Sequence, residues 1–372
     1  MLLTASLIVR DESEFLDGCL ASLHGLVDEI VVVDTGSTDG TPDIAAAHGA
    51  VIDHFEWRND FSAARNRSLD LSHGEWILYI DADERVRDDD PDATRRALRD
   101  ATGTVAFRVL FVPRVGWTPY REFRLWRHDP EIRFIAAMHE SIVPAITRVA
   151  ARDQRTIDTF DQFTIDHLGY EGDQARKRRR DEPLLLAGIA ASPQRTYLYD
   201  HLARVYEAAG DPDRAVAMWR RGIEVARART TDHPDDRLVY IGLLFHLLYH
   251  ESLDGDFGAL VAEAEARYAD VPTVQLAAAR YEFATGRPRE AMPRLEQLLS
   301  HDPDVPVDTN SSYDRRVFGE WSWDLLGLCR FQLGDDAGAA EAFRAAEAAA
   351  PDVAAYGVRR RLAEARAKVE PQ

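Results

Sequence analysis

Cysteine is scarce in this sequence, with Cys19 and Cys329 the only two among 372 residues. Two cysteines so far apart exclude a disulfide framework and a cysteine-rich zinc site, because both need several sulfur ligands at short spacings. Low cysteine usage is typical of proteins in a reducing compartment. We therefore expect a cytoplasmic location.

Long apolar runs are missing as well. The most apolar stretch, LVYIGLLFHLLYHE at residues 238–251, is shorter than the run of about 18 apolar residues that a membrane span needs. At the N-terminus, MLLTASLIV is followed at once by charged residues, which leaves too little room for a signal peptide. The sequence thus predicts no membrane span and no secretion signal.

Positive charge is in deficit. Lys and Arg number 45 against 64 Asp and Glu, so the formal net charge is −19. Such a chain is a poor partner for nucleic acid or an anionic membrane, because like charges repel. It suits a protein that binds a metal ion through carboxylates. The hydrophobic content of 45% allows a sizeable core, and the length predicts two domains.

The first 170 residues alternate strand-like and helix-like segments. Strands are predicted at residues 2–9, 29–34, 50–55 and 75–83, with helices at 14–26, 42–49 and 61–72. Continuous apolar strands that alternate with helices indicate a mostly parallel sheet covered on both faces. Such sheets bind ligands at the carboxyl ends of their strands.

Acidic residues follow two of these strands. Asp34 ends EIVVVD, just before a small polar turn and a helix, and YIDADE places Asp81 and Asp83 one residue apart. Strand alternation predicts that the second pair shares one face, where two carboxylates can bind Mg²⁺ or Mn²⁺. Acids at strand ends are also common as solvated charge, and Ser37 to Asp39 suit a helix cap. Both interpretations stay open at this point.

Several motifs in order resemble one family. SLIVRDESEFLDGCLASL, VDEIVVVDTGSTDGT, WRNDFSAARNRSLDLSHGEWILYIDADE and FRLWRHDPEIRFIAAMHES together look like family 2 glycosyltransferases with the GT-A fold. The resemblance covers roughly residues 3–170. The similar subgroup includes lipopolysaccharide-core glucosyltransferase-like proteins and peptide S-glycosyltransferases.

The resemblance implies a nucleotide-sugar donor, with UDP the expected nucleotide. The residues whose positions match donor-binding motifs are Val9, Glu12, Asp34, Asp60, Ala64, Arg65, Asp81 and Ala82. Asp34 would contact the uridine, and Asp81 would lie near the ribose. Asp83 resembles the ligand of a Mn²⁺ or Mg²⁺ ion between the phosphates, and His167 resembles a histidine that adds a metal contact. The alternative for His167 is a structural histidine in a linker.

Sugar transfer also needs a base that removes the acceptor's proton. In MHES, Glu140 is the predicted base, and His139 is the alternative base or a residue that orients the acceptor. A purely structural pairing of these two side chains is a third interpretation. Arg124 and Arg127 in FRLWRHD would face the phosphates or the acceptor, or else lie on the strand surface. Family resemblance implies inversion by direct displacement.

After about residue 185, Ala-rich helical pairs replace the strands. The pairs cover residues 197–226, 274–303 and 321–352, with turns at Gly210, Gly286 and Gly334, and a further unit is expected around 253–260. Small residues where helices would cross, and an Ala339 to Phe343 element, resemble tetratricopeptide repeats. Solenoids of this kind often bind peptides or associate with themselves.

We therefore expect a GT-A domain over residues 1–170, a linker helix over 171–195 and a TPR-like repeat domain over 196–372. The expected acceptor is a peptide, a protein or a small molecule, and a homodimer through the repeats is a further expectation. One alternative is a non-catalytic scaffold with a vestigial glycosyltransferase domain. Another is a sugar nucleotidyltransferase, which usually has a Gly-rich loop after its first strand, a feature that IVRDESEF lacks.

Overall fold

The computed structural model describes residues 1–113, 115–168, 174–231, 233–253, 255–308 and 311–368, with the backbone alone described for 174–180. It divides into two compact units. The first, here the N-terminal unit, comprises residues 1–115, 119–180 and 306–312. The second, here the helical unit, comprises residues 116–118, 181–305 and 313–372. The predicted linker over 171–195 begins in residues outside the described ones.

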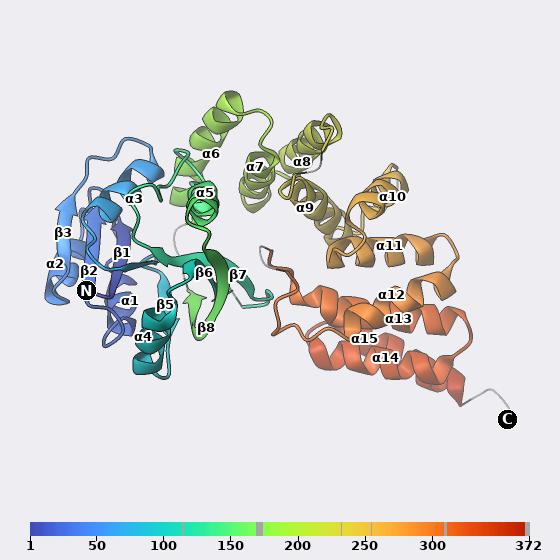
Figure 1. The fold of residues 1–372 in the computed structure, drawn as a ribbon. Coiled ribbons are helices and arrows are strands. Elements are labelled where there is room, and N and C mark those ends of the chain that lie inside the picture. Colours follow the sequence, from blue (N-terminus) through green and yellow to red (C-terminus); the bar gives the residue numbers. More distant parts are fainter. Residues whose placement is uncertain (114, 169–173, 232, 254, 309–310, 369–372) are drawn as a thin grey trace. The chain divides into compact units, whose positions relative to one another are not determined.

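A sheet forms the centre of the N-terminal unit (Figure 1). Counted over the described residues, it has eight strands in the order β3-β2-β1-β4-β7-β6-β8-β5. The strands are β1 (Leu3–Val9), β2 (Glu29–Asp34), β3 (Val51–His54), β4 (Trp76–Tyr79), β5 (Glu84–Arg87), β6 (Thr104–Val112), β7 (Tyr120–Arg127) and β8 (Thr156–His167). The four strands predicted from the sequence correspond to β1 to β4.

The sheet is mixed rather than parallel throughout. β1 pairs in parallel with β2 and β4, β2 with β3, and β6 with β8. The pairs β4–β7, β6–β7 and β5–β8 are antiparallel. The all-parallel part, β1 to β4, is therefore the part that the apolar strand pattern predicted, and the strands that follow it in the chain pair in both directions.

Helices cover both faces of this sheet. On one face, α1 (Leu16–Ser22), α2 (Thr41–Ala47) and α4 (Pro91–Asp100) contribute Leu16, Ala45 and Leu98 to a core with alternate residues of β1. On the other face, α3 (Phe61–Asp70) and α5 (Val143–Asp153) contribute Leu69 and Ile146 to a second core. The period of two along each strand sends successive side chains to opposite cores.

Local signals set several helix ends. Pro42 lies in the first turn of α2, where its missing N–H leaves no helical hydrogen bond unmade. Asp60 is the N-cap of α3, and its side chain accepts a hydrogen bond from the Ala63 N–H at 3.0 Å. The starts of α2 and α3 therefore each follow a short loop after the carboxyl ends of β2 and β3.

The predicted strand at 75–83 is too long by several residues. β4 ends at Tyr79, and Ala82 and Asp83 lie in a turn closed by a hydrogen bond from the Glu84 N–H to the Asp81 carbonyl at 3.1 Å. The inference that strand alternation puts Asp81 and Asp83 on one face is therefore wrong. The turn reverses the chain into β5, so that the two carboxylates meet different partners.

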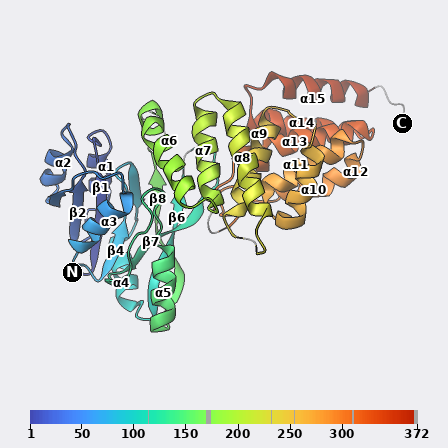
Figure 2. The same ribbon diagram turned by 90° about the horizontal axis from the view of Figure 1, so that it is seen from above.

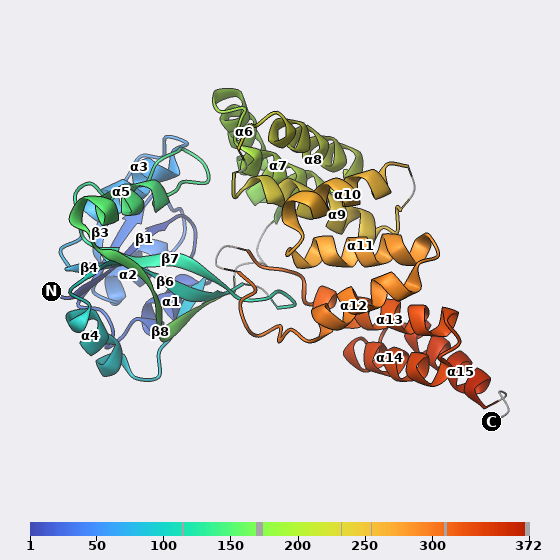
Figure 3. The same ribbon diagram turned by 45° about the vertical axis from the view of Figure 1, so that its right-hand side comes forward.

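Helices dominate the second unit. They are α7 (Thr196–Ala208), α8 (Pro212–Arg227), α9 (Asp236–Tyr249), α10 (Phe257–Tyr268), α11 (Pro272–Ala284), α12 (Pro288–Leu299), α13 (Glu320–Gln332), α14 (Asp336–Ala349) and α15 (Ala354–Ala367), preceded by α6 (Gln174–Ala191), which crosses the boundary between the units. From α7 onward each helix packs against the next (Figures 2 and 3). The three predicted helical pairs are confirmed as α7–α8, α11–α12 and α13–α14.

Glycines serve two purposes in these pairs. Gly210, Gly286 and Gly334 turn the chain at φ values of 76°, 78° and 83°, which favour glycine because it has no Cβ. Gly327 in α13 instead allows close packing, since a Cβ there would lie 2.6 Å from a ring carbon of Phe343 in α14. The predicted small residue at a helix crossing is thus confirmed for this pair. Among the helices that the structure describes, none combines the length and apolar character needed to cross a membrane.

Candidate active site

The predicted donor-binding residues gather at one edge of the N-terminal unit. β1, β2 and β4 run in parallel, and Val9 pairs directly with Asp34 at their carboxyl ends. Asp81 follows β4 at the same edge, two residues beyond Tyr79. The structure therefore brings Val9, Asp34 and Asp81 to the edge where open α/β sheets bind their ligands.

Asp34 is buried and holds the polar turn that follows it. Its carboxylate accepts a hydrogen bond from the Ser37 N–H at 3.0 Å and contacts the exposed His54 ring at 3.2 Å. Ser37 does not cap α2, because its hydroxyl accepts from the Asp11 N–H at 2.9 Å. Asp39 accepts from the Thr41 N–H at 3.0 Å, but the N-cap of α2 is Gly40, so the interpretation of Ser37 to Asp39 as a helix cap is wrong. The turn thus ties the β1–α1 loop to the β2–α2 loop.

Arg65 lies between two carboxylates. Its Nη2 contacts Asp81 Oδ1 at 3.0 Å, and its Nε donates to Glu140 Oε1 at 2.5 Å. Burial alone would lower the pKa of Arg65, but its acidic neighbours raise it above its ordinary value. The guanidinium therefore stays charged and joins a predicted donor-binding residue to the predicted base.

Tyr79 lies beneath this contact and was not identified from the sequence. Its ring is stacked between the guanidinium groups of Arg65 and Arg124, at 4.2 and 4.4 Å from the ring centroid. Its hydroxyl donates to Asp81 Oδ2 at 3.1 Å. Burial raises the pKa of Tyr79, so the hydroxyl remains a donor to that carboxylate.

Glu84 and Arg124 form a buried pair below the turn. The two nitrogens of Arg124 donate to both Glu84 oxygens at 2.8 and 3.1 Å, and Glu84 Oε2 also accepts from the Asp81 N–H at 2.9 Å. Burial raises the pKa of Glu84 to about 8, although Arg124 acts in the opposite direction. Arg124 is therefore neither at the surface nor free to face a ligand. It holds the backbone of the acidic turn.

Asp83 contacts His167, as the resemblance implied for two ligands of one ion. Asp83 Oδ2 and His167 Nε2 are 3.2 Å apart, and the two side chains are 17% and 19% exposed. The antiparallel pairing of β5 with β8 produces this contact, because it places Glu84 opposite His167. A carboxylate oxygen and an imidazole nitrogen so close together fit one divalent cation.

The predicted base lies in a loop that contacts the start of α3. The Phe61 N–H donates to the Ala137 carbonyl at 2.8 Å, and the Ser62 hydroxyl to the Ala136 carbonyl at 2.6 Å. Ala136 and His139 have φ values of 78° and 50°, a left-handed backbone that is unfavourable for residues other than glycine. Strained backbone of this kind is often found at functional sites.

The remaining predicted donor residues have structural partners in this edge. Asp60 caps α3, and Ala64 is buried in the same helix. The Glu12 N–H donates to Thr41 Oγ1 at 2.8 Å, and the Ala82 carbonyl accepts from Arg85 at 3.1 Å. Their contacts with a nucleotide stay predictions.

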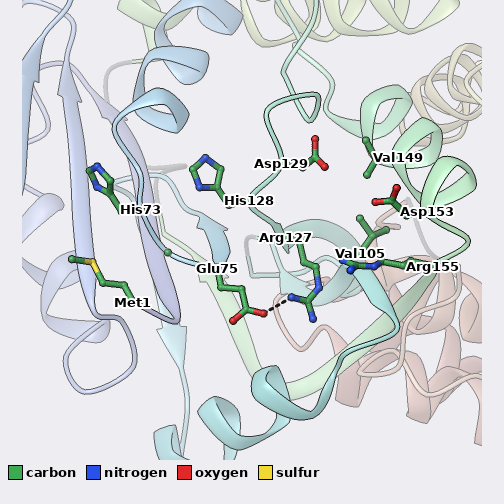
Figure 4. Close-up of a pocket in the computed structure, with 11 residues that line it drawn as sticks. Met1, His73, Glu75, Val105, Arg127, His128, Asp129, Val149, Asp153 and Arg155 are labelled. Atoms are coloured by element: carbon green, nitrogen blue, oxygen red, sulfur yellow. Dashed lines mark hydrogen bonds and ion pairs between the residues drawn. The ribbon is translucent and has the colours of Figure 1, made fainter.

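A separate cavity of about 380 Å³ opens at the opposite end of the sheet (Figure 4). Met1, His73, His128 and the ion pair of Glu75 with Arg127 line it. These residues flank the amino ends of β1 and β4. Arg127 therefore lies far along the strands from the acidic edge, and the interpretation that it faces the phosphates is wrong.

Comparison with known proteins finds a family match within the N-terminal unit. Residues 6–155 match the model of glycosyl transferase family 2, a range that includes the acidic edge and Glu140. This stretch of the chain is therefore similar to family 2 glycosyltransferases. The N-terminal unit has the helix-covered mixed sheet expected from this similarity, and the TPR-like helical unit follows it in the chain.

Three relatives are named either as a repeat protein or as a glycosyltransferase. A TPR repeat-containing protein of Synechococcus elongatus is 35% identical over 266 residues, 70% of this chain and 64% of its own. The SPbeta prophage-derived glycosyltransferase SunS of Bacillus subtilis is 41% identical over 83 residues, 22% of this chain and 20% of its own. The lipopolysaccharide core biosynthesis glycosyltransferase LpsC of Rhizobium meliloti is 31% identical over 159 residues, 38% of this chain and 57% of its own. The chain thus spans less than two thirds of the length of each relative.

Proposed function

We propose that this chain transfers a sugar from a nucleotide diphosphate sugar, with UDP the expected nucleotide, to an acceptor. The observation that carries the proposal is the set of carboxylates at one sheet edge of a unit similar to family 2 glycosyltransferases. Asp34 and Asp81 lie there, and Asp83 follows Asp81 beside His167. Carboxylates at this edge suit the hydroxyls and the cation-bound phosphates of a nucleotide sugar.

In this proposal Asp83 and His167 hold a divalent cation. Mn²⁺ fits this donor pair better than Mg²⁺, because Mg²⁺ prefers oxygen ligands alone. When bound, the cation neutralises negative charge that develops on the diphosphate leaving group. Asp34 binds the nucleoside, and the Glu84–Arg124 pair keeps Asp81 in place through its backbone N–H.

Glu140 is the proposed base. Its Oε1 contacts Arg65, so Oε2 is the oxygen that accepts the proton of the attacking acceptor group. As that proton moves to Glu140, the acceptor atom bonds to the anomeric carbon and the bond to the diphosphate breaks. This single displacement inverts the anomeric centre. His139 is the alternative base, and the variants Glu140→Gln and His139→Gln distinguish the two through their transfer rates.

The helical unit favours a peptide or protein acceptor, because repeat solenoids present extended binding surfaces. A small-molecule acceptor is the alternative. An acceptor screen that compares peptides with small hydroxyl and thiol compounds separates these two classes.

The test is release of the nucleoside diphosphate from a panel of nucleotide sugars with Mn²⁺, with Mg²⁺ and with EDTA. We expect slow release without acceptor, loss of release in EDTA, and a decrease of about 100-fold in Asp83→Asn. Asp100→Asn, which changes an exposed acid in α4, is the matched control and should behave as the wild type. Failure to turn over any nucleotide sugar, together with tight peptide binding, would favour the non-catalytic scaffold.

A further inference from the structure

The helical unit contains a group of metal-ligating side chains that has no part in the proposed sugar transfer. Glu207 lies in the last turn of α7, His246 in the last turn of α9, and His250 is the C-cap that follows α9. One ligand atom from each of these residues lies within 4.8 Å of the other two. The cluster therefore joins α7 to α9.

The two histidines share one helix face. In the segment HLLYH they stand four residues apart, a spacing that places two imidazoles side by side on a helix and is used by zinc sites. Their ring centroids are 4.5 Å apart. The helix backbone therefore places both rings where they can bind the same metal ion without rearrangement.

His246 is held in place by its surroundings. It is buried, and its Nδ1 lies 2.8 Å from Glu207 Oε1. Its ring packs on Trp219, whose indole N–H donates to the buried Asp200 at 2.8 Å. A ligand whose orientation is fixed by packing and hydrogen bonds loses little freedom when a metal binds.

The distances suit a small divalent ion. Two ligands of a tetrahedral zinc with bonds of 2.0–2.1 Å lie about 3.3 Å apart. The separation of 2.8 Å between His246 and Glu207 is close to this value, and a hydrogen bond draws the pair slightly closer when no ion separates them. His250 is exposed, so water can reach the cluster and complete the coordination.

We propose that Glu207, His246 and His250 bind a divalent cation of the Zn²⁺ class, which links α7 to α9 in the helical unit. Two imidazole nitrogens and one carboxylate are ligands that Zn²⁺ accepts, and a water fills the fourth position. The site is distinct from the Asp83–His167 pair in its donors and lies in the other unit. It does not depend on the proposed sugar transfer.

Zn²⁺ and Co²⁺ titrations of the full chain test this site. Asp83→Asn serves as the background, because it removes a proposed ligand of the other cation. We expect one equivalent of Zn²⁺ by calorimetry and the intense visible absorption of four-coordinate Co²⁺. His250→Ala and Glu207→Gln should each weaken binding at least about 10-fold. Zn²⁺ should raise the melting temperature of the background protein but not of the His250→Ala variant.

Matched controls make the result specific. His233→Ala and Glu224→Gln change exposed residues of the same unit outside the cluster and should bind as the background does. Because His250 is exposed, its variant should keep the helical circular dichroism of the wild type. Binding as tight in His250→Ala as in the background would overturn the proposal, as would the absence of any Zn²⁺ binding in the Asp83→Asn protein.

Discussion

Arg65 connects the proposed donor-binding edge to the proposed catalytic base. It contacts Asp81 at the donor edge and Glu140 in the loop that carries the predicted base. Removing one partner of a buried ion pair leaves an unpaired charge in a poorly solvated place. Arg65 is therefore a positioning residue whose loss should affect stability and turnover together.

The first prediction concerns Arg65→Lys. A single ammonium cannot reproduce the fork that contacts two carboxylates, so turnover should fall at least about 10-fold. Complete removal in Arg65→Met should lower the free energy of unfolding by about 3–5 kcal/mol. Nucleotide release and urea denaturation measure these effects.

Arg67→Lys is the control for this prediction. Arg67 lies on the same helix and pairs with Asp53 at 2.7 Å, but 42% of its side chain is exposed. An exposed pair contributes little to stability, so both measurements should stay near the wild-type values. Wild-type turnover in Arg65→Lys would contradict the positioning role.

The second prediction concerns Asp39 and the pH dependence of stability. Burial opposes its ionisation, but hydrogen bonds from Thr41 and Ser13 outweigh that effect and lower the pKa from 3.8 to about 2. A lowered pKa stabilises the folded state above pH 3.8, and this stabilisation is lost as the pH falls towards 2. The stability advantage of the wild type over Asp39→Asn should therefore shrink across that window. Since Asp39 is exposed, the advantage should stay below about 1 kcal/mol.

Urea denaturation of both proteins at a series of pH values measures this difference. A difference that stays constant from pH 5 to about pH 2 would show that the Asp39 charge makes no contribution.

At the scale of elements, two antiparallel strands decide the geometry of the candidate metal pair. β5 follows the acidic turn and pairs with β8, so that the Leu168 N–H donates to the Asp83 carbonyl at 2.8 Å. The side chains of Asp83 and His167 then meet, although 84 positions of sequence separate them. The pair is thus a product of strand pairing rather than of any local motif.

The crossing of α13 and α14 gives a prediction about packing. In Gly327→Ala the added Cβ would lie 2.6 Å from the buried ring of Phe343, so the helices must separate or the ring must move. Overpacking of this kind should lower the free energy of unfolding by about 1–3 kcal/mol. Thermal or urea denaturation of the full chain measures the loss.

Gly319→Ala is the matched control, because a Cβ there would meet its nearest neighbour, the Arg315 carbonyl, at an ordinary 3.4 Å. The two variants should differ clearly in stability. Equal stability in both variants would show that α13 and α14 can accommodate the added methyl group without a loss of stability.

At the scale of the whole molecule, charge limits the partners. The formal net charge of −19 should prevent binding to nucleic acid, since phosphate backbones attract proteins through Lys and Arg. We expect no mobility shift of double-stranded DNA or of RNA at physiological salt. A shift that weakens as salt rises would contradict this expectation. The cytoplasmic location and the homodimer through the repeats stay predictions.

Much of the secondary structure could be predicted because its signals are local. The predicted strand at 29–34 corresponds to β2 residue for residue, and Gly210, Gly286 and Gly334 lie at the turns of the three predicted helical pairs. The acidic end of β2 was also visible, since Asp34 directly follows an apolar run. Periodicity and turn chemistry depend on neighbouring residues alone, so they can be read without the fold.

The sequence by itself thus determined the parallel strands, the helical pairs and the edge where the acids lie. Only the tertiary structure decided that Arg65 joins Asp81 to Glu140, that Arg124 is buried on Glu84, and that Glu207 meets His246. The residues in these contacts are between 16 and 75 positions apart in the sequence. No local period specifies such partners, because they depend on how the strands order in the sheet and how the helices pack.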